Sequence, residues 1–188
     1  MNRRFSLYLP SDDTYLLLSC LEGYRGRSAL EIGTGSGIIL NELCKRFSTV
    51  VGTDIDFKSL LFCNQTSRKA ASLICCDAAN ALSSREKYDL IISNPPYLPV
   101  DKTEIQDRTI HGGITGSDVA IGFVRSAINL LSKTGVILIL LSNLSNLPKF
   151  HKEITSLGLF RRTISRKKLF FEYLSVEELG LFPPHNFK

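Results

Sequence analysis

The sequence predicts an α/β fold with a mostly parallel seven-stranded sheet and an antiparallel C-terminal strand pair. Short apolar segments alternate with amphipathic segments of helical length, which is typical of a parallel sheet covered by helices on both faces. A glycine-rich loop follows the first apolar segment of this series. The last two strand-like segments follow each other through a basic turn, with no helix between them. Such a pair closes one edge of the sheet, and a simple dinucleotide-binding fold does not end in this way.

The helices are predicted from caps and apolar periodicity. Ser11-Asp12-Asp13-Thr14 precedes an apolar run, so we expect a leading helix that ends near Gly23. Further helices fit residues 37–46, 57–68, 117–131 and 146–157. Parallel strands are expected at 29–32, 50–54, 73–76, 90–93 and 136–141, and the antiparallel pair at 160–165 and 170–176.

The size of the chain, 188 residues and 21.0 kDa, predicts one domain over residues 1–188. Within it we expect a leading helical segment at 1–26, an active-site loop at 98–116 and a tail at 178–188. The most apolar run, residues 135–141, is too short to span a bilayer, and no apolar signal segment stands at the N-terminus. We therefore expect a cytoplasmic protein with no membrane partner.

The cysteines, histidines and charged residues limit which metal sites, disulfides and partners the chain can have. Five cysteines form no C-x-x-C pair and three histidines lie far apart, so we expect no metal site and no disulfide. The net charge of +5 permits a nucleic-acid partner without requiring one. Basic residues gather near the C-terminus, where a solvated turn is favoured over a binding patch: Arg161, Arg162, Arg166, Lys167 and Lys168.

The glycine-rich loop Gly33-Thr34-Gly35-Ser36-Gly37 carries glycines at alternate positions, which lets a ligand approach the backbone closely. A nicotinamide or flavin fingerprint requires glycine where this chain has Ile38, so the dehydrogenase class is disfavoured. Glu31, just before the loop, is poorly placed beside a pyrophosphate but suits the cationic amino group and sulfonium of S-adenosyl-L-methionine (SAM). The charge therefore favours SAM as cofactor, with S-adenosyl-L-homocysteine as product.

Two further acids follow the next two strands. Asp54 ends the second strand about 20 residues after the glycines, where a carboxylate accepts hydrogen bonds from both ribose hydroxyls. Asp77 follows the third strand and is placed to accept from the adenine amino group. Because the carboxyl ends of parallel strands meet at one edge of a sheet, Glu31, Asp54 and Asp77 together predict one cofactor site.

Asn94-Pro95-Pro96-Tyr97 directly follows the fourth parallel strand and is the candidate catalytic motif. Each proline lacks an N–H and fixes φ, so the turn is stiff and its carbonyls keep their direction. The Asn94 side-chain oxygen and the Pro95 carbonyl could accept both N–H bonds of a planar NH2 group and point its lone pair at the sulfonium methyl. An ordinary turn is the alternative interpretation. Tyr97 either packs against the planar substrate or is a buried aromatic under the loop.

These motifs resemble those of the HemK-type protein-(glutamine-N5) methyltransferases, in particular the short archaeal and eukaryotic branch that modifies class I release factors. The opening from Tyr8 to Leu17 looks like the family's Y-x-P-x-[ED]-D-T-x-L-L, although Leu9 stands where many relatives have Glu. The glycine loop, Asp54, Asp77, Asn94 to Tyr97 and Gly112-Gly113-x-x-Gly116 match in the same order.

The resemblance implies a class I SAM-dependent methyltransferase fold of the Rossmann-like type. The implied reaction is transfer of a methyl group to the side-chain amide nitrogen of the glutamine in the release factor's Gly-Gly-Gln motif. The implied catalytic residues are Asn94, Pro95, Pro96 and Tyr97. The predicted cofactor site comprises Thr14, Glu31, Gly33, Thr34, Gly35, Gly37, Asp54, Ile55, Asp77, Ala78 and Asn94.

The same branch often works with a small zinc-binding activator subunit. In the usual strand order the third strand is an edge, and Leu73 to Cys76 is short and apolar, with no Lys or Pro to discourage pairing. We therefore expect that another chain covers this edge.

Two alternatives remain open. The candidate motif does not distinguish glutamine from a base, so a nucleic-acid exocyclic-amine methyltransferase of the N6-adenine type is the second hypothesis. Such an enzyme must flip the base out of its stack and bind the neighbouring nucleotides. The sequence has neither an appended recognition domain nor a basic stripe interleaved with aromatic residues that would do so. The basic C-terminal hairpin is the best support for this hypothesis. The third is a SAM-binding partner protein without activity, against which the intact Asn94 to Tyr97 motif argues.

Overall fold

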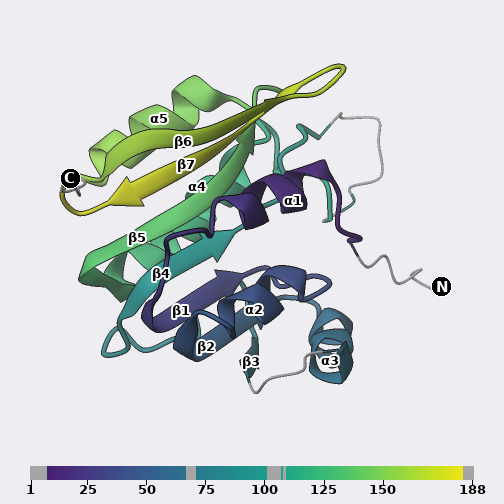
Figure 1. The fold of residues 1–188 in the computed structure, drawn as a ribbon. Helices are drawn as coiled ribbons and strands as arrows, with labels where there is room; N and C mark the ends of the chain where they lie inside the picture. The colour runs from purple at the N-terminus through teal and green to yellow at the C-terminus, as the bar shows by residue number, and fades with distance from the viewer. Residues whose placement is uncertain (1–7, 67–70, 101–106, 108, 184–188) are drawn as a thin grey trace.

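The computed structural model of the protein describes residues 8–66, 71–100, 107 and 109–183, which form one seven-stranded sheet with helices on both faces (Figure 1). The strand order is β3-β2-β1-β4-β5-β7-β6. The strands are β1 Gly26–Ile32, β2 Phe47–Asp54, β3 Ser72–Cys75, β4 Tyr88–Ser93, β5 Leu131–Ser142, β6 Phe160–Lys168 and β7 Tyr173–Gly180. The helices are α1 Asp12–Ser19, α2 Ile38–Leu43, α3 Phe57–Thr66, α4 Asp118–Ala127 and α5 Leu147–Ser156, with a 3-10 turn η1 at Ile128–Leu130.

The pairing of the strands confirms the predicted sheet. β3, β2, β1, β4 and β5 pair in parallel, whereas β7 pairs antiparallel with both β5 and β6. β3 lies at one edge, as expected. The carboxyl ends of β1 and β4 are in register, Ile32 opposite Ser93, so the loops that follow them leave the sheet side by side.

Two apolar clusters hold the layers together, one on each face of the sheet. Ile91 faces the cluster that α4 and α5 cover, and its neighbour Ile92 faces the cluster that α1 and α2 cover. Both side chains are fully buried, so truncation of either to alanine would cost about 2–5 kcal/mol of the free energy of unfolding. Among the described residues, no helix has the length and hydropathy needed to cross a bilayer.

The junction between α4 and β5 differs from the prediction. The helix expected at 117–131 ends at Ala127, and β5 begins at Leu131 rather than at residue 136. Leu131 is buried and pairs with Tyr88 of β4, so sheet pairing outweighs the helical pattern there. α1 also ends earlier than expected, at Ser19.

The C-terminal pair is longer than predicted and is shifted along the chain. β6 extends to Lys168 and β7 begins at Tyr173, so residues 178–180 of the expected tail are strand. Glu177 and Glu178 are buried in β7, and their charges are compensated from β6 by Arg161 (Nη1 to Oε2, 2.8 Å) and Arg162 (Nε to Oε1, 2.7 Å).

Arg161 and Arg162 lie within the strand predicted at 160–165. The expectation of a solvated turn is wrong for these two and for the other three basic residues, because β6 extends to Lys168. The edge strand expected at Leu73 to Cys76 is β3, Ser72–Cys75, so Cys76 lies just beyond it. Parts of four predicted segments lie outside the described residues: 1–7 of the leading segment, 67–68 of the helix expected at 57–68, 101–106 and 108 of the active-site loop, and 184–188 of the tail.

Candidate active site

The carboxyl ends of β1, β2 and β4 bring the predicted site residues to one edge of the sheet. The backbone N–H groups of Gly33 and Thr34 donate to the Thr53 carbonyl of β2, at 2.8 and 3.1 Å. On the other side, the Ser93 hydroxyl of β4 donates to the Ile32 carbonyl at 2.8 Å. The glycine loop is thus fixed between the two strands that carry Asp54 and Asn94.

The glycines of this loop adopt a backbone conformation that other residues rarely take. Gly33, Gly35 and Gly37 have φ of +77°, +46° and +76°. A Cβ on Gly33 would meet its nearest neighbour, the ring of Phe123, only at 3.8 Å, whereas a Cβ on Gly37 would lie 2.8 Å from Cys63 Sγ. Gly33 therefore leaves backbone open to a ligand, and Gly37 lets α3 pack against the loop.

Two acids, Glu31 and Asp54, lie at this loop, and no basic side chain of the described residues forms an ion pair with either. Asp54 accepts from the N–H groups of Gly35 and Asp56, each at 2.9 Å. Glu31 is 2% exposed, and its Oε2 has no hydrogen-bond partner among the described residues. Burial, and then the charge of Asp54, raise the pKa of Glu31 well above its usual value, and burial also raises the pKa of Asp54. The site therefore favours a cationic ligand beside Glu31.

Three further residues of the predicted cofactor site, Ile55, Asp77 and Ala78, lie just beyond the ends of β2 and β3. Asp77 is exposed, and Ile55 exposes 52% of its surface next to Asp54. The Cys76 N–H donates to the Asp54 carbonyl at 3.0 Å, which ties the two strand ends together. Ala78 has φ of +50°, a conformation that costs an L-residue about 1–2 kcal/mol. Strain of this kind gathers at ligand sites, in agreement with the predicted position.

The start of α1 contacts the candidate catalytic motif. Asn94 Nδ2 donates to Thr14 Oγ1 at 3.5 Å, and the Asn94 side chain also lies close to the Tyr8 hydroxyl. Both partners are held by buried Asp13: Thr14 Oγ1 donates to it at 3.1 Å, and the Tyr8 hydroxyl donates to it as well. With its amide NH2 engaged in this way, Asn94 has a buried Oδ1 that no described residue contacts by a hydrogen bond.

This network gives Thr14 a contact that the sequence did not predict. The sequence placed it among cofactor-binding residues, and in the structure it is 4% exposed and accepts from Asn94. Tyr8 and Asp13 were not predicted as site residues. Their only signal in the sequence was their place in the opening motif.

A second support comes from Gly112 and Gly116. A Cβ on Gly112 would lie 2.5 Å from the Pro96 carbonyl oxygen, and one on Gly116 would lie 2.4 Å from the Tyr97 carbonyl oxygen. Gly112 also donates its N–H to the Leu98 carbonyl at 2.8 Å. The glycine segment therefore packs directly against the backbone that follows Pro95 and holds it in place.

Tyr97 is half-buried and packs against the apolar cluster under α1 and α2. Burial, together with the carboxylates of Asp13 and Glu172, raises the pKa of its hydroxyl. Glu172 in turn accepts from the Ser142 hydroxyl at 2.6 Å. This environment favours the interpretation of Tyr97 as a buried aromatic.

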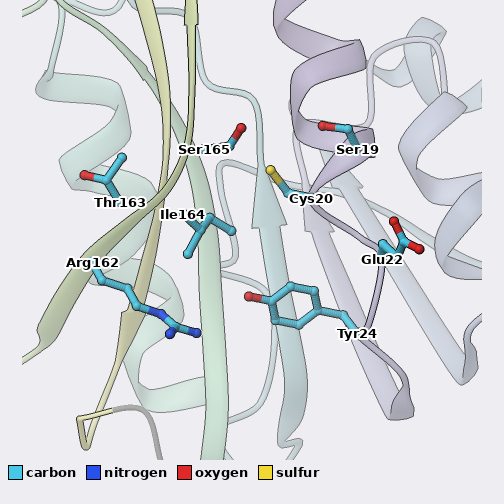
Figure 2. A pocket seen from close by; sticks show the side chains of 8 residues that line it. All are labelled: Ser19, Cys20, Glu22, Tyr24, Arg162, Thr163, Ile164 and Ser165. Carbon is cyan, nitrogen blue, oxygen red and sulfur yellow. The ribbon is translucent and has the colours of Figure 1, made fainter. Parts of the chain in front are cut away.

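One hollow of the described structure lies away from these residues. It measures about 490 Å³ and lies between the end of α1 and β6 (Figure 2). None of the predicted site residues lines it; its lining residues are Ser19, Cys20, Glu22, Tyr24, Arg162, Thr163, Ile164 and Ser165.

The site and fold agree with comparisons to known proteins. The methyltransferase small domain family matches residues 5–162. A Methanocaldococcus jannaschii protein named "Putative protein N5-glutamine methyltransferase" is 30% identical over 90% of this chain and 89% of its own. Mouse methyltransferase HEMK2 is 28% identical over 90% and 87%. Among solved structures, a chain of the E. cuniculi Mtq2–Trm112 complex, described as responsible for methylation of the eRF1 translation termination factor, has a TM-score of 0.75 at 26% identity. That match covers 92% of this chain and 97% of that chain.

The chain therefore belongs to the methyltransferase small domain family, with the class I SAM-dependent methyltransferase fold. Within that family it is a HemK-type methyltransferase of the archaeal and eukaryotic kind, as the motifs predicted.

Proposed function

We propose that this enzyme transfers the methyl group of SAM to the side-chain amide nitrogen of the glutamine in the Gly-Gly-Gln motif of a class I release factor. The observation that carries the proposal is the Asn94 side chain, whose amide NH2 donates to Thr14 while its Oδ1 is buried and unpaired among the described residues. A buried acceptor without a partner is costly, by about 1–3 kcal/mol, unless a ligand supplies the donor. The relatives' printed functions support glutamine as the source of that donor.

The Pro95 carbonyl supplies the second acceptor. Among the described residues, no backbone N–H outside the helices and strands donates to it. Asn94 Oδ1 and this carbonyl would accept the two N–H bonds of a primary amide and leave its nitrogen lone pair directed away from both. Because an amide nitrogen is a weak nucleophile, fixed orientation carries most of the rate enhancement.

The residues at the ends of β1, β2 and β3 fit SAM, which supplies an activated methyl group when bound. The unpaired Oε2 of Glu31 would face the cationic amino group or sulfonium, and Gly33 offers open backbone beside it. The Asp54 carboxylate accepts from two backbone N–H groups and has further lone pairs that could accept hydrogen bonds from the ribose hydroxyls. Exposed Ile55 and Asp77 would then contact the adenine.

We also infer an activator subunit at the edge strand β3. α3 packs beside β3 at this edge of the sheet (Figure 1), and it leaves Phe57 61% and Leu61 45% exposed. An unpaired strand edge beside exposed apolar side chains favours addition of a strand from another chain. Similarity to the Mtq2 complex supports a small partner of the Trm112 kind.

This inference is tested by hydrogen exchange at Leu73 to Cys75, with and without such a subunit. Protection on addition of the subunit, together with higher activity, supports it. A monomer with unchanged exchange and no gain in activity would contradict it.

The function is tested by transfer of labelled methyl from SAM to a class I release factor, to its Gly-Gly-Gln glutamine-to-alanine variant, and to total RNA and DNA. We expect label on the wild-type factor only. Label on nucleic acid alone would show that the methyl acceptor is the amine of a base, and the proposed cofactor site would still stand. Binding of SAM with no transfer to any of these would favour a partner protein without activity.

A further inference from the structure

The turn between β6 and β7, together with the strand ends beside it, carries an exposed aromatic and basic surface over residues 166–173 that we call the hairpin tip. Phe170 and Phe171 are 91% and 85% exposed, and their rings contact each other edge to face with centroids 4.5 Å apart. Arg166 and Lys168 are exposed beside them. The sequence prediction that basic residues are not interleaved with aromatics is therefore wrong here. Aromatic side chains exposed to this degree on an ordered hairpin mark a binding surface.

The hairpin tip lies on the same side of the sheet as the carboxyl ends of β1, β2 and β4, which carry the predicted site residues. Ser93, the last residue of β4, is opposite Ile139, which is opposite Glu177 of β7. Tyr173 lies four residues beyond Glu177 in the direction of those carboxyl ends, so the hairpin tip extends about 13 Å beyond the end of β4. Because β5 lies between β4 and β7, the tip is also displaced sideways from β4 by two strand spacings, about 10 Å. Figure 1 shows the hairpin projecting on the side toward which the β1 and β4 arrows point.

Contacts with the site fix the orientation of the hairpin tip. The Tyr173 N–H donates to Asn143 Oδ1 at 2.6 Å, and the Asn143 N–H donates to the Tyr173 carbonyl at 3.0 Å. Glu172 faces Tyr97 of the catalytic motif. Lys167 Nζ lies 2.8 Å from Asp12 Oδ1 at the start of α1. The hairpin that carries the exposed rings is thus held at a set position relative to the candidate catalytic motif.

We propose that the hairpin tip docks the protein substrate, on an apolar patch bordered by acidic side chains next to the loop that carries the methylated glutamine. The inference rests on the proposed function. A standard interface buries about 800 Å² per partner, a patch roughly 30 Å across, so an interface centred on Asn94 extends about as far as the tip. The exposed Arg166 and Lys168 favour acidic neighbours, and Phe170 and Phe171 supply the apolar centre.

The details of the tip favour protein over nucleic acid as the occupant. The two phenylalanine planes meet at 85°, so they do not present parallel faces for successive bases. Lys168 Nζ lies over the Tyr173 ring, 5.6 Å from its centroid, and covers one face of it. Lys167 is already paired with Asp12, which lowers the charge available for phosphates.

The experiment compares the wild-type enzyme with the double variant Phe170→Ser/Phe171→Ser in methylation of a class I release factor at saturating SAM. We expect KM for the factor to rise at least tenfold, with kcat within twofold, because neither ring contacts the catalytic motif. Phe182→Ser is the matched control: it removes a 63% exposed phenylalanine at the opposite end of β7, and its KM should not change. Arg166→Glu/Lys168→Glu should also raise KM, and more strongly at low salt.

An unchanged KM in the phenylalanine double variant would overturn the docking surface while leaving the proposed function in place. Loss of tRNA binding in a gel-shift assay with KM for the factor unchanged would assign the tip to nucleic acid and also overturn the inference. Absence of factor methylation by the wild-type enzyme would overturn the proposed function, and the docking surface with it.

Discussion

Substitution of Gly112 by alanine tests whether the glycine segment positions the catalytic motif. The new Cβ would lie 2.2 Å from the Gly116 carbonyl oxygen and 2.5 Å from that of Pro96. Both neighbours are backbone atoms, so neither can turn away as a flexible side chain would. Gly112 does not have a positive φ, so the effect of the substitution comes from this contact rather than from backbone strain.

The size of the effect follows from these distances. To restore van der Waals contact, the two carbonyls must move away from the new methyl group by roughly 1 Å. A displacement of this size in a positioning group costs about 100-fold in rate. Overpacking of the same kind costs about 1–3 kcal/mol of the free energy of unfolding. Glu31 and Gly33 lie on another strand, so the SAM dissociation constant should stay within about twofold.

The assay measures kcat for release-factor methylation, SAM binding by calorimetry and thermal unfolding. Gly122→Ala is the control, because a Cβ at this exposed position in α4 would meet nothing within 4 Å. It should stabilise the helix by about 0.5–1 kcal/mol and leave kcat unchanged. A Gly112→Ala enzyme that is folded and retains wild-type kcat would refute the argument that this segment sets the position of the Pro96 carbonyl.

The remaining predictions concern the cofactor site and Tyr97. Because burial raises the pKa of Glu31, the folded protein binds its proton more tightly than the unfolded chain, and this site's contribution to stability falls as pH rises through that pKa. Glu31→Gln should therefore raise the melting temperature of the SAM-free protein at pH 7 and weaken SAM binding; a lower melting temperature would contradict the assigned shift. In the wild type, the SAM dissociation constant should increase as pH falls below the raised pKa, and Glu31→Gln should lose this dependence in calorimetric titrations. Asp54→Ala should weaken SAM binding about tenfold to a hundredfold, a change that equilibrium dialysis resolves and that an unchanged constant would disprove. Tyr97→Phe, which keeps the ring and removes the hydroxyl, should change kcat by less than about threefold if packing is its role; a hundredfold loss would instead assign the hydroxyl to catalysis.

The fold could be predicted because its signals are local. Alternating apolar strands and amphipathic helices give the sheet, and the acids and glycines at strand ends give the cofactor edge. The antiparallel pair was located but misplaced along the chain. Its strands depend on Glu177 and Glu178 being buried against Arg161 and Arg162, a pairing across strands that neither segment shows alone.

The site could be predicted in its parts but not in how they support one another. Asn94 was found from the motif that contains it, whereas its contact with Thr14, which Asp13 holds in turn, joins segments 80 residues apart. The packing of Gly112 behind Pro96 is equally non-local, and it appears only once the loop is folded back on the motif.

The most direct measurement is tandem mass spectrometry of a class I release factor after incubation with SAM and either the wild-type enzyme or Asn94→Ala. With the wild type we expect one added methyl group on the side-chain nitrogen of the Gly-Gly-Gln glutamine. With Asn94→Ala we expect a rate lower by about 100-fold or more, because one preorganised acceptor is lost. A methyl group on any other residue, or equal rates for the two enzymes, would contradict the claim that the Asn94 oxygen orients the substrate amide.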